Sequence, residues 1–356
     1  MKAIILVGGE GTRLRPLTCN TPKSMVPVLN RPFLEHVLLH LKSHNVDTAV
    51  LALGHLSRSV ADYFGDGSKL GIKVIYSLEN QPLGTAGPVK LAGEYLAETF
   101  LVLNGDVYCD FDITSIVDMH VRNRSVATLT LTPVEDPTVY GVVETRSGGG
   151  VKRFVEKPKR EEVTSNMINA GLYVLEPEVL GYIPEDKKVM FEHDVFPALL
   201  RDGKPMFAYP QPGYWIDIGT PQKYLQVNLD LMRKGKGDPK SRSAKTGVDP
   251  TARIRGPVLL PDDCIVGPGA EITGPAVIGA SCRIGARARV TGSVLWPNSE
   301  MAEGCQVLGS VVANDCHVGA EAILEQCYVS DHVVVAPGAK TEPGTKLWPG
   351  TRCEST

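Results

Sequence analysis

The sequence of 356 residues contains no long apolar run. Its N-terminal apolar stretch of about six residues is too short for a signal peptide, and no segment approaches the roughly 18 apolar residues that span a bilayer. The chain also lacks an excess of one charge, because 37 Lys and Arg stand against 40 Asp and Glu. A net charge of −3 argues against a general nucleic-acid or membrane surface, so any anion must be bound by a local cluster.

Two further patterns are missing. The eight cysteines never form a C-x-x-C pair, so we expect no zinc site or redox dithiol, and they are typical of reduced thiols in a cytoplasmic protein. The chain has no G-x-x-x-x-G-K-[ST] loop, and its only early G-x-G reaches Leu14 where a dinucleotide fingerprint needs glycine. The standard nucleotide motifs are therefore excluded.

The first half of the chain alternates strand and helix patterns. Strand patterns at 3–7, 48–53, 73–76 and 100–103 alternate with helical spacing at 33–41 and 86–97. This order predicts an α/β domain over residues 1–232, with a Rossmann-like, mostly parallel sheet. In such sheets ligands bind at the carboxyl ends of the strands, where the first apolar run ends.

The second half follows a period of six. The apolar positions of this period are Ile254, Leu260, Val266, Ile272, Ile278, Ile284, Val290 and Trp296, with a slip of register near 297–312. Glycine after several of these positions indicates a hexapeptide repeat, which predicts a left-handed parallel β-helix over residues 251–356. Cys264 and Cys282 should stack on successive coils. Residues 233–250 are polar and predict a linker between the two domains.

The segment between the first strand and the first helix joins bare backbone to positive charge. Gly8, Gly9 and Gly11 allow close approach of a ligand to backbone N–H groups, which form anion nests. Arg13 and Lys23 add full positive charges, and arginine can hold phosphate oxygens in a bidentate manner. The segment therefore predicts a polyphosphate site.

At this point the sequence resembles a known family. GGEGTRLRPLT-x-x-x-PK is similar to the N-terminal signature of sugar-1-phosphate nucleotidylyltransferases, which join a nucleoside triphosphate to a sugar 1-phosphate and release pyrophosphate. The likeness continues in order through QPLGTAG (81–87), NGD (104–106), YG (140–141), FVEKP (154–158), NAG (169–171) and WIDIGTP (215–221). LGTAG with FVEKP most resembles mannose-1-phosphate guanylyltransferases, which implies GTP and mannose 1-phosphate as substrates.

The resemblance also implies site residues. Asp106 and Asp217 would hold Mg²⁺, Arg13 would stabilise the β- and γ-phosphates, and Lys23 would neutralise the α-phosphate. The implied nucleotide-binding residues are Leu6, Gly8, Gly9, Gly11, Thr12, Arg13, Gln81, Gly84, Thr85 and Asp106. The implied sugar-phosphate residues are Lys23, Gly141, Glu156, Lys157, Asn169 and Asp217.

Two local expectations come from the residues themselves. Glu156 and Lys157 are adjacent, so on a strand they would face opposite sides. Asp110, Asp112 and Asp118 follow NGD and are more typical of helix caps and exposed first-turn acids than of a site.

Other functions stay open at the level of sequence. Within the same reaction, dTTP or UTP with glucose 1-phosphate is the alternative. The β-helix could carry an acyltransferase activity, with His317 or His332 as the base. The chain could also be a non-catalytic regulatory subunit that binds a nucleotide sugar, although Arg13, Lys23 and both aspartates are present. We expect a homo-oligomer formed through the β-helix, whose open edges can pair.

Overall fold

The computed structural model describes residues 1–54, 57–236 and 247–354, which form two compact units. The first unit contains Met1–Glu10 and Leu34–Asp217, and the second contains Gly11–Phe33 and Ile218–Thr356. The glycine-rich segment is thus divided, and most of it is grouped with the C-terminal half. The boundaries expected at 232 and 251 stay a prediction, and residues 237–246 of the expected linker lie outside the described residues.

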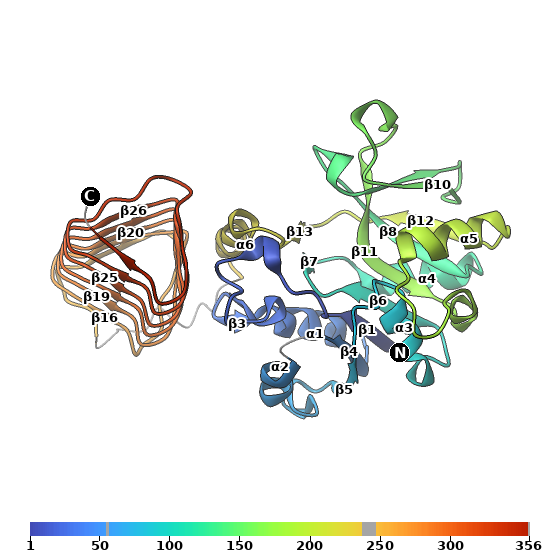
Figure 1. Ribbon diagram of the computed structural model, residues 1–356, viewed down its shortest axis with the longest axis horizontal. Helices are drawn as coiled ribbons and strands as arrows, with labels where there is room; N and C mark the ends of the chain where they lie inside the picture. The colour runs from blue at the N-terminus through green and yellow to red at the C-terminus, as the bar shows by residue number, and fades with distance from the viewer. Residues whose placement is uncertain (55–56, 237–246, 355–356) are drawn as a thin grey trace. The chain divides into compact units, whose positions relative to one another are not determined.

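The first unit is built on a nine-stranded sheet (Figure 1). Its strands run in the order β10-β9-β11-β6-β1-β4-β5, and β8 pairs with both β11 and β12. The strands are β1 (Lys2–Leu6), β4 (Thr48–Leu53), β5 (Lys73–Leu78), β6 (Phe100–Asn104), β8 (Ala127–Pro133), β9 (Gly141–Thr145), β10 (Val151–Glu156), β11 (Met167–Leu175) and β12 (Met206–Pro210). A separate pair joins β7 (Val107–Cys109) to β13 (Trp215–Asp217).

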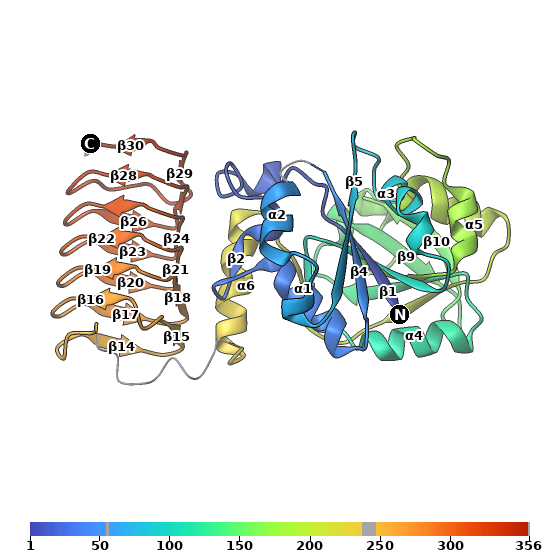
Figure 2. The same cartoon turned by 90° about the horizontal axis from the view of Figure 1, so that it is seen from below.

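The predicted α/β fold is confirmed. Strands β6, β1, β4 and β5 are parallel neighbours, so their carboxyl ends lie at one edge of the sheet. The helices are α1 (Phe33–Ser43), α2 (Ser57–Phe64), α3 (Gly87–Leu91), α4 (Ile113–Arg122) and α5 (Phe196–Arg201). Figures 1 and 2 place α1 and α3 on opposite sides of β1 and β4. The helix expected over 86–97 ends at Leu91, and a 3-10 turn begins at Gly93, a residue that disfavours helix interiors.

The core of the first unit explains its continuous apolar strands. Ile4, Val50 and Val102 from three parallel strands pack in one buried cluster with Val89 of α3 and Phe196 of α5. Strands covered on both faces need apolar side chains at every position, as the run of buried residues in β4 shows. Among the described residues, we find no helix that is both long and apolar enough to cross a membrane.

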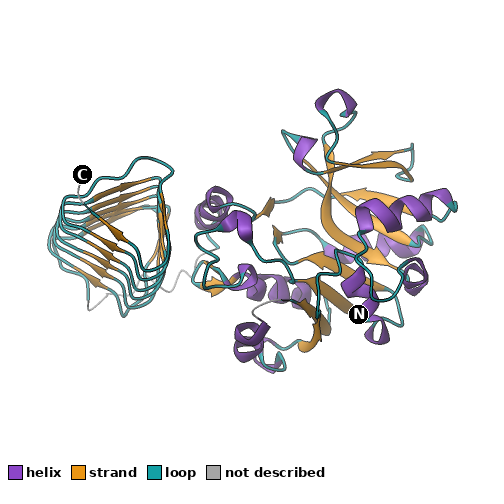
Figure 3. Ribbon diagram, viewed as in Figure 1, coloured by secondary structure: helices purple, strands orange, loops and turns teal. Residues whose placement is uncertain are grey.

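The second unit contains a parallel β-helix whose coils are visible as a stack in Figure 2. Three parallel sheets form its sides, in the orders β14-β17-β20-β23-β26, β15-β18-β21-β24-β27-β29 and β16-β19-β22-β25-β28-β30. Their strands are β14 (Arg253–Arg255), β15 (Val258–Leu259), β16 (Ile265–Val266), β17 (Glu271–Thr273), β18 (Ala276–Ile278), β19 (Arg283–Ile284), β20 (Arg289–Thr291), β21 (Val294–Leu295), β22 (Glu300–Met301), β23 (Gln306–Leu308), β24 (Val311–Val312), β25 (His317–Val318), β26 (Ile323–Glu325), β27 (Tyr328–Val329), β28 (Val334–Val335), β29 (Lys346–Leu347) and β30 (Arg352–Cys353). Figure 3 shows these strands joined by short loops, consistent with the predicted left-handed β-helix.

The period of six breaks earlier than expected. Ile278 pairs with Leu295, so Leu295 and not Trp296 occupies the inward position. The cause is one residue fewer at the corner after Thr291: only Gly292-Ser293 lies between Thr291 and Val294, whereas Gly274-Pro275-Ala276 lies between their partners Thr273 and Val277. Hydrogen bonds between successive coils join residues 18 apart before this corner and 17 apart in the coils that follow it, and the last coil returns to 18, as Tyr328 and Lys346 show.

The buried cysteines of the β-helix act as corner residues. Cys264 and Cys282 follow each other along the stack, and their thiols contact Gly279 O at 3.1 Å and Trp296 O at 3.2 Å. Cys316 makes the same kind of contact with Ser330 O at 2.9 Å. Burial raises the pKa of Cys282 and Cys316 to about 12, which keeps these thiols protonated as donors. The structural role expected for Cys264 and Cys282 is confirmed.

The remaining elements of the second unit come from both ends of the N-terminal half. They are α6 (Pro221–Arg233), the short pair β2 (Pro27–Val28) and β3 (Arg31–Pro32), and the 3-10 turns Thr12–Leu14 and Lys23–Met25. Pro221 stands in the first turn of α6, and the Thr220 hydroxyl accepts a hydrogen bond from Lys223 N, which caps the helix.

Candidate active site

Two neighbouring strands end together at the carboxyl edge of the parallel sheet. Leu6 ends β1 and Asn104 ends β6, and the two residues pair in register. Gly105 N then donates to Leu6 O at 2.9 Å, so the chain continues past β6 close against β1. A Cβ at Gly105 would lie 2.5 Å from Leu6 O, which explains glycine in the NGD motif. This turn places Asp106 at the strand ends, where open α/β sheets bind ligands.

The structure brings Asp106 and Asp217 together. Strand β13 runs antiparallel to β7 and sets Asp217 opposite Val107, the residue after Asp106. Both aspartates are half-buried. Two acidic residues from distant motifs therefore lie at adjoining positions of one strand pair.

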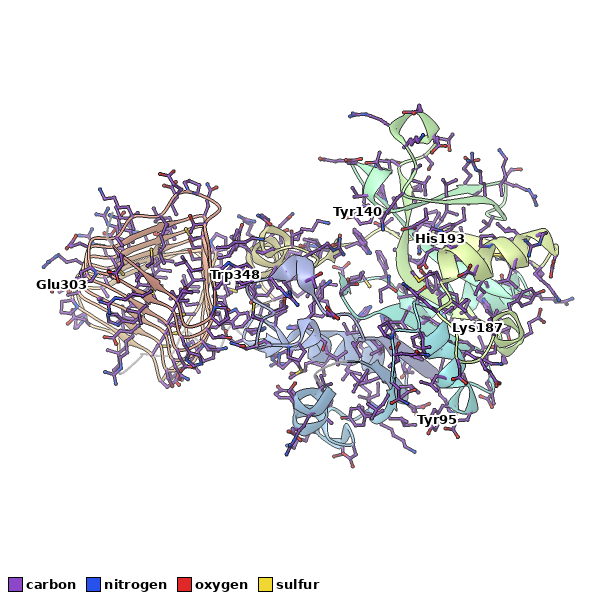
Figure 4. The ribbon with its side chains drawn as sticks, in the orientation of Figure 1. Tyr95, Tyr140, Lys187, His193, Glu303 and Trp348 are labelled. Atoms are coloured by element: carbon purple, nitrogen blue, oxygen red, sulfur yellow. The ribbon has the colours of Figure 1, made fainter. Side chains whose placement is uncertain are left out.

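Asp217 is held by an aromatic pair. Tyr140 Oη donates to Asp217 Oδ2 at 2.5 Å, and the Tyr140 ring packs edge-on against Trp215 with centroids 5.4 Å apart. Trp215 Nε1 in turn donates to Ala170 O at 2.9 Å. Figure 4 labels Tyr140 on the first unit. These contacts tie the YG, NAG and WIDIGTP motifs to one carboxylate.

The two carboxylates of Asp106 and Asp217 fit a hard divalent cation that takes most of its ligands from water and phosphate. Within the described ranges, no group of three or more His, Cys, Asp and Glu side chains could enclose a metal ion. Mg²⁺ commonly takes only one or two protein carboxylates and completes its shell with substrate oxygens. Asp106 and Asp217 supply that number.

A second group gathers on β9, β10 and β11. Glu156 pairs with Gly141, and a Cβ at Gly141 would lie 2.7 Å from Glu156 Oε2. Asn169 follows Ile168 in β11, and Ile168 pairs with Val142, the residue after Gly141 in β9. The FVEKP, YG and NAG motifs thus meet, as an arrangement for one ligand requires.

The expected orientation of Lys157 is wrong. Its Nζ lies 3.5 Å from Glu156 Oε1, so the two side chains reach the same side. Strand β10 ends at Glu156, and Lys157 adopts a φ of +47°, which breaks the alternation of a strand. Lys157 N donates to Tyr140 O at 3.0 Å, which fixes this turn beside the YG motif.

Gly171 is required by a close approach between strands. Its φ is +74°, and a Cβ there would lie 2.5 Å from Asn104 Nδ2. Gly171 N donates to Asn169 Oδ1 at 3.0 Å. The NAG motif therefore shapes the turn that faces the strand leading to Asp106.

A line of polar side chains connects this group to the QPLGTAG loop. Asn169 Nδ2 donates to Tyr173 Oη at 2.6 Å, and Tyr173 Oη lies 3.5 Å from Glu192 Oε1 as its donor. Thr85 Oγ1 donates to Glu192 Oε2 at 2.8 Å and accepts from Phe191 N at 2.9 Å. Burial raises the pKa of Glu192, and the nearby negative charge of Glu156 adds to the rise. Sequence motifs gave no signal for Glu192.

Glu79 is a second residue that the motifs missed. A Cβ at Gly8 would lie 2.6 Å from Glu79 Oε1, so this carboxylate reaches the backbone of the glycine-rich segment. Glu79 Oε2 accepts from Leu83 N at 3.1 Å, which anchors the QPLGTAG loop. Burial raises the pKa of Glu79 above its ordinary value, while the Leu83 bond opposes this rise. Its position two residues before Gln81 was the only available signal.

The other residues of the two glycine-containing motifs have different surroundings. Gly9 and Gln81 are exposed, and nothing lies within 4 Å of a Cβ at Gly9. A Cβ at Gly84 would lie 2.4 Å from Val189 O, so this glycine serves the packing of the loop on Val189.

The cationic residues lie in the second unit. Gly11 has a φ of +64° and starts the 3-10 turn that carries Thr12 and Arg13, both exposed. A Cβ at Gly11 would lie 3.1 Å from Lys23 Cβ, so Lys23 packs against the glycine turn. Gly11, Thr12, Arg13 and Lys23 are therefore brought together within this unit.

Two aspartates and two histidines of lesser weight are also placed. Asp112 caps α4 by accepting from Ser115 N at 3.2 Å, as expected. Asp110 is not a helix cap, because its Oδ1 accepts from Tyr214 N at 2.6 Å and pins the segment before β13. His317 and His332 lie on the outside of the β-helix, 3.5 Å from Glu300 and 3.9 Å from Asp315.

Comparisons with known proteins agree with this geometry. Residues 2–234 match the family described as "Nucleotidyl transferase", and residues 254–346 match the "GMPPB C-terminal domain". The chain is 38% identical to "Mannose-1-phosphate guanylyltransferase" of Mycobacterium tuberculosis, over 71% of this chain and 67% of the relative. It is 40% identical to "Mannose-1-phosphate guanylyltransferase catalytic subunit beta" of Drosophila melanogaster, over 71% and 70%. The crystal structure of HddC from Yersinia pseudotuberculosis complexed with GMP-PN is similar with a TM-score of 0.56 and 30% identity, over 65% of this chain and 99% of that one.

Proposed function

The chain belongs to the nucleotidyl transferase family, and from this we propose that it transfers GMP from GTP to mannose 1-phosphate, forming GDP-mannose and pyrophosphate. The observation that carries the reaction class is the pairing of Asp217 with Val107, the residue after Asp106, across β7 and β13. Relatives named mannose-1-phosphate guanylyltransferase at about 40% identity support the two substrates.

The reaction needs positioning more than proton transfer. An oxygen of the sugar phosphate attacks the α-phosphorus in line, and the bond from this phosphorus to the pyrophosphate oxygen breaks. A phosphate monoester has a second pKa of about 6, so it is mostly a dianion at neutral pH and needs no general base. Negative charge spreads over the non-bridging and leaving oxygens, where fixed cations stabilise it.

Asp106 and Asp217 are the residues that would hold Mg²⁺. When bound, the ion would neutralise phosphate charge as a Lewis acid. Tyr140 donates a hydrogen bond to one carboxylate oxygen of Asp217. The same contact fixes the orientation of the other oxygen.

Arg13 and Lys23 supply the protein's own positive charge. Arg13 binds the β- and γ-phosphates of the nucleotide, and Lys23 neutralises the α-phosphate in the transition state. Because the charge on the α-phosphoryl oxygens grows during transfer, Lys23 contributes more to turnover than to nucleotide binding. Gly11 and Thr12 offer backbone N–H groups beside Lys23.

Glu79 supports guanine as the base. The guanine edge presents two adjacent donors, the ring N1–H and the 2-amino group, whereas uracil and thymine present one N–H between two carbonyls. A carboxylate accepts two parallel hydrogen bonds and offers no donor, so it matches guanine and not a pyrimidine. Glu79 lies against Gly8, while Leu6, Gly9, Gln81, Gly84 and Thr85 complete the proposed nucleotide-binding set.

Glu156, Lys157, Asn169 and Gly141 form the proposed sugar-phosphate site. Glu156 and Asn169 accept and donate hydrogen bonds to sugar hydroxyls, and Lys157 pairs with the phosphate. The Lys157 side chain is 67% exposed, and its Nζ lies 3.5 Å from Glu156 Oε1, so it can turn to an incoming anion. Gly141 leaves room for the ring beside Glu156.

The test is a matrix of GTP, ATP, CTP, UTP and dTTP against mannose 1-phosphate and glucose 1-phosphate, read as pyrophosphate release with and without Mg²⁺. A dominant signal for GTP with mannose 1-phosphate is expected. A dominant signal for dTTP or UTP with glucose 1-phosphate would keep the reaction and replace the substrates. Silence across the matrix would favour the regulatory-subunit alternative, and acetyl transfer from acetyl-CoA would favour the acyltransferase one.

Assembly and location are part of this proposal. The outermost coil strand β14 pairs with β17 on one side and carries Ile254, which is 40% exposed. An open strand edge with an exposed apolar residue favours pairing with another protomer, so we expect a homo-oligomer. The cytoplasmic location is a separate expectation from the cysteines. Light scattering at micromolar concentration tests this, and a monomer would contradict it.

A further inference from the structure

One edge of the β-helix contacts the loop between Gly11 and Phe33, which carries Arg13 and Lys23. We define the corner row as Ile278, Trp296, Ser330 and Asp331, which end or follow strands β18, β21 and β27. Ser330 Oγ donates to Pro16 O at 2.9 Å, and Asp331 Oδ2 accepts from Asn20 Nδ2 at 3.1 Å. Ile278 O accepts from Asn30 Nδ2 at 2.6 Å. Three coils therefore contribute to one contact line.

Helix α6 continues this line to the same loop. Trp296 Nε1 donates to Tyr224 Oη at 2.8 Å, and Tyr224 Oη donates to Pro27 O. Both aromatic side chains are fully buried. Asn228 Oδ1 accepts from Leu29 N at 2.9 Å. A buried tyrosine that both accepts and donates is a rigid spacer, because either lost bond leaves an unsatisfied polar group.

The loop has little regular structure to hold itself. Between Gly11 and Phe33 it forms two 3-10 turns and one two-residue strand pair. Backbone carbonyls outside helices and sheets need other donors when they are buried. The contacts at Pro16 and Asn20 lie between Arg13 and Lys23 in the chain, and those at Pro27, Leu29 and Asn30 follow Lys23.

We propose that the corner row is a positioning element for Arg13 and Lys23, so that the β-helix sets the geometry of nucleotidyl transfer besides any role in assembly. Ser330 and Asp331 are its positioning residues. The catalytic consequence rests on the proposed function, whereas the ordering of the loop does not.

Asp331 is built for this contact. Its Oδ1 accepts from Asn314 N at 3.1 Å and from Asn314 Nδ2 at 2.9 Å, and the residue is 4% exposed. The carboxylate is thus fixed by the preceding coil and presents its other oxygen to Asn20. A charged acceptor held this way makes a stronger bond to an amide than a neutral acceptor would.

The test uses an exchange of the two side chains in the full-length protein. Asn20→Asp sets two carboxylates against each other. In the double variant, Asn20→Asp with Asp331→Asn, the new amide donates to the new carboxylate and its oxygen still accepts from Asn314. We expect N20D to lower turnover about tenfold with less than about twofold change in KM, because misplaced catalytic groups lose rate rather than binding. The double variant should recover to within about threefold of the parent protein.

Hydrogen exchange of the loop gives a readout that needs no substrate. Leu17 N and Cys19 N donate to Leu14 O and Pro16 O at 3.2 and 3.3 Å. Their exchange should quicken about tenfold in N20D and return in the double variant. Ser299→Ala is the matched control, since Ser299 Oγ bonds inside the β-helix, donating to Ala313 O at 2.6 Å and accepting from Cys316 N at 3.2 Å. If N20D does not fold, Ser330→Ala replaces it against the same control.

Each outcome decides the inference. Faster loop exchange in N20D or S330A but not in S299A, with recovery on exchange of the pair, supports it. Equal loop exchange in all variants overturns it. If the parent protein shows no turnover in the substrate matrix, the proposed function fails while the exchange data still judge the contact.

Discussion

The hydroxyl of Tyr140 lies 2.5 Å from Oδ2 of Asp217 as its donor. The two residues belong to motifs 77 positions apart, and Trp215 supports the tyrosine ring from the side. A carboxylate so held keeps one orientation whether or not a cation is bound. Orientation of a metal ligand by a neighbouring donor commonly contributes tenfold or more to metal affinity.

Tyr140→Phe should therefore weaken Mg²⁺ binding. The ring still packs on Trp215, but Asp217 loses the hydrogen bond from Tyr140, so the Mg²⁺ concentration for half-maximal turnover should rise about tenfold. Calorimetric titration of Mg²⁺ into the protein checks the same change without substrate. Tyr63→Phe, a surface variant, is the control. An unchanged Mg²⁺ titration would remove Tyr140 from this role.

Glu79→Gln should alter base selection. The glutamine oxygen can still accept from Leu83 N, but its amino group opposes the guanine donors. We expect kcat/KM with GTP to fall about 100-fold, as for a buried polar group left with a wrong partner. The loss should be smaller with ITP, which lacks the 2-amino group. Glu98→Gln, an exposed carboxylate, should change neither value. Equal losses for GTP and ITP would contradict the assignment.

The same carboxylate predicts a pH dependence. Burial raises the pKa of Glu79, and guanine needs its charged form. The KM for GTP should therefore increase as pH falls through this raised pKa, at a higher pH than an exposed glutamate would cause. KM measured against pH at saturating mannose 1-phosphate checks this, and the dependence should be absent in E79Q.

Gly171→Ala should disturb the turn that faces Asn104. Both Gly171, at φ +74°, and Gly148, at φ +94°, disfavour a side chain, so each alanine variant should lose about 1 kcal/mol in urea unfolding. Only Gly171 would place a Cβ 2.5 Å from Asn104 Nδ2, whereas nothing lies within 4 Å of a Cβ at Gly148. Turnover should fall at least about tenfold in G171A alone. Similar turnover in the two variants would argue against it.

Glu192→Gln should change how stability depends on pH. Burial, helped by the charge of Glu156, raises the folded-state pKa of Glu192 above the unfolded value of 4.5. The folded protein holds this proton more tightly, so the contribution is present below the unfolded pKa and is lost as pH rises through the folded one. E192Q keeps an acceptor for Thr85 and no charge, so its stability relative to the parent should rise over this window. Urea unfolding between about pH 4 and 8 measures this, with Glu161→Gln as an exposed control.

The parts of the fold with local signals could be predicted from the sequence. Ile4 and Val50 lie in continuous apolar runs, and Ile272 and Ile284 lie in the period of six, so both sheet types were visible. Trp296 shows the limit of counting. One residue fewer after Thr291 moves the inward position to Leu295, and periodicity alone does not locate such a corner.

The site was predictable where motifs mark it and not where distant segments complete it. Asp106 and Asp217 were found by resemblance, and their proximity came from the register of two short strands, which pairs Asp217 with the residue after Asp106. Glu79 and Glu192 have no motif of their own, because their roles depend on what Gly8 and Thr85 bring near them. Ser330 and Pro16 are 314 positions apart, and no local pattern links them.

The grouping of residues 11–33 with the C-terminal half bears on how such chains can recombine. Judged by position in the sequence alone, a crossover at the polar segment near residue 240 exchanges whole domains between relatives. It would instead give the loop of one parent to the corner row of the other, and Asn20 would meet a foreign residue where Asp331 stood. We expect a working chimera to carry the loop and the corner row from the same parent. The segments that must be inherited together are therefore separated in the chain.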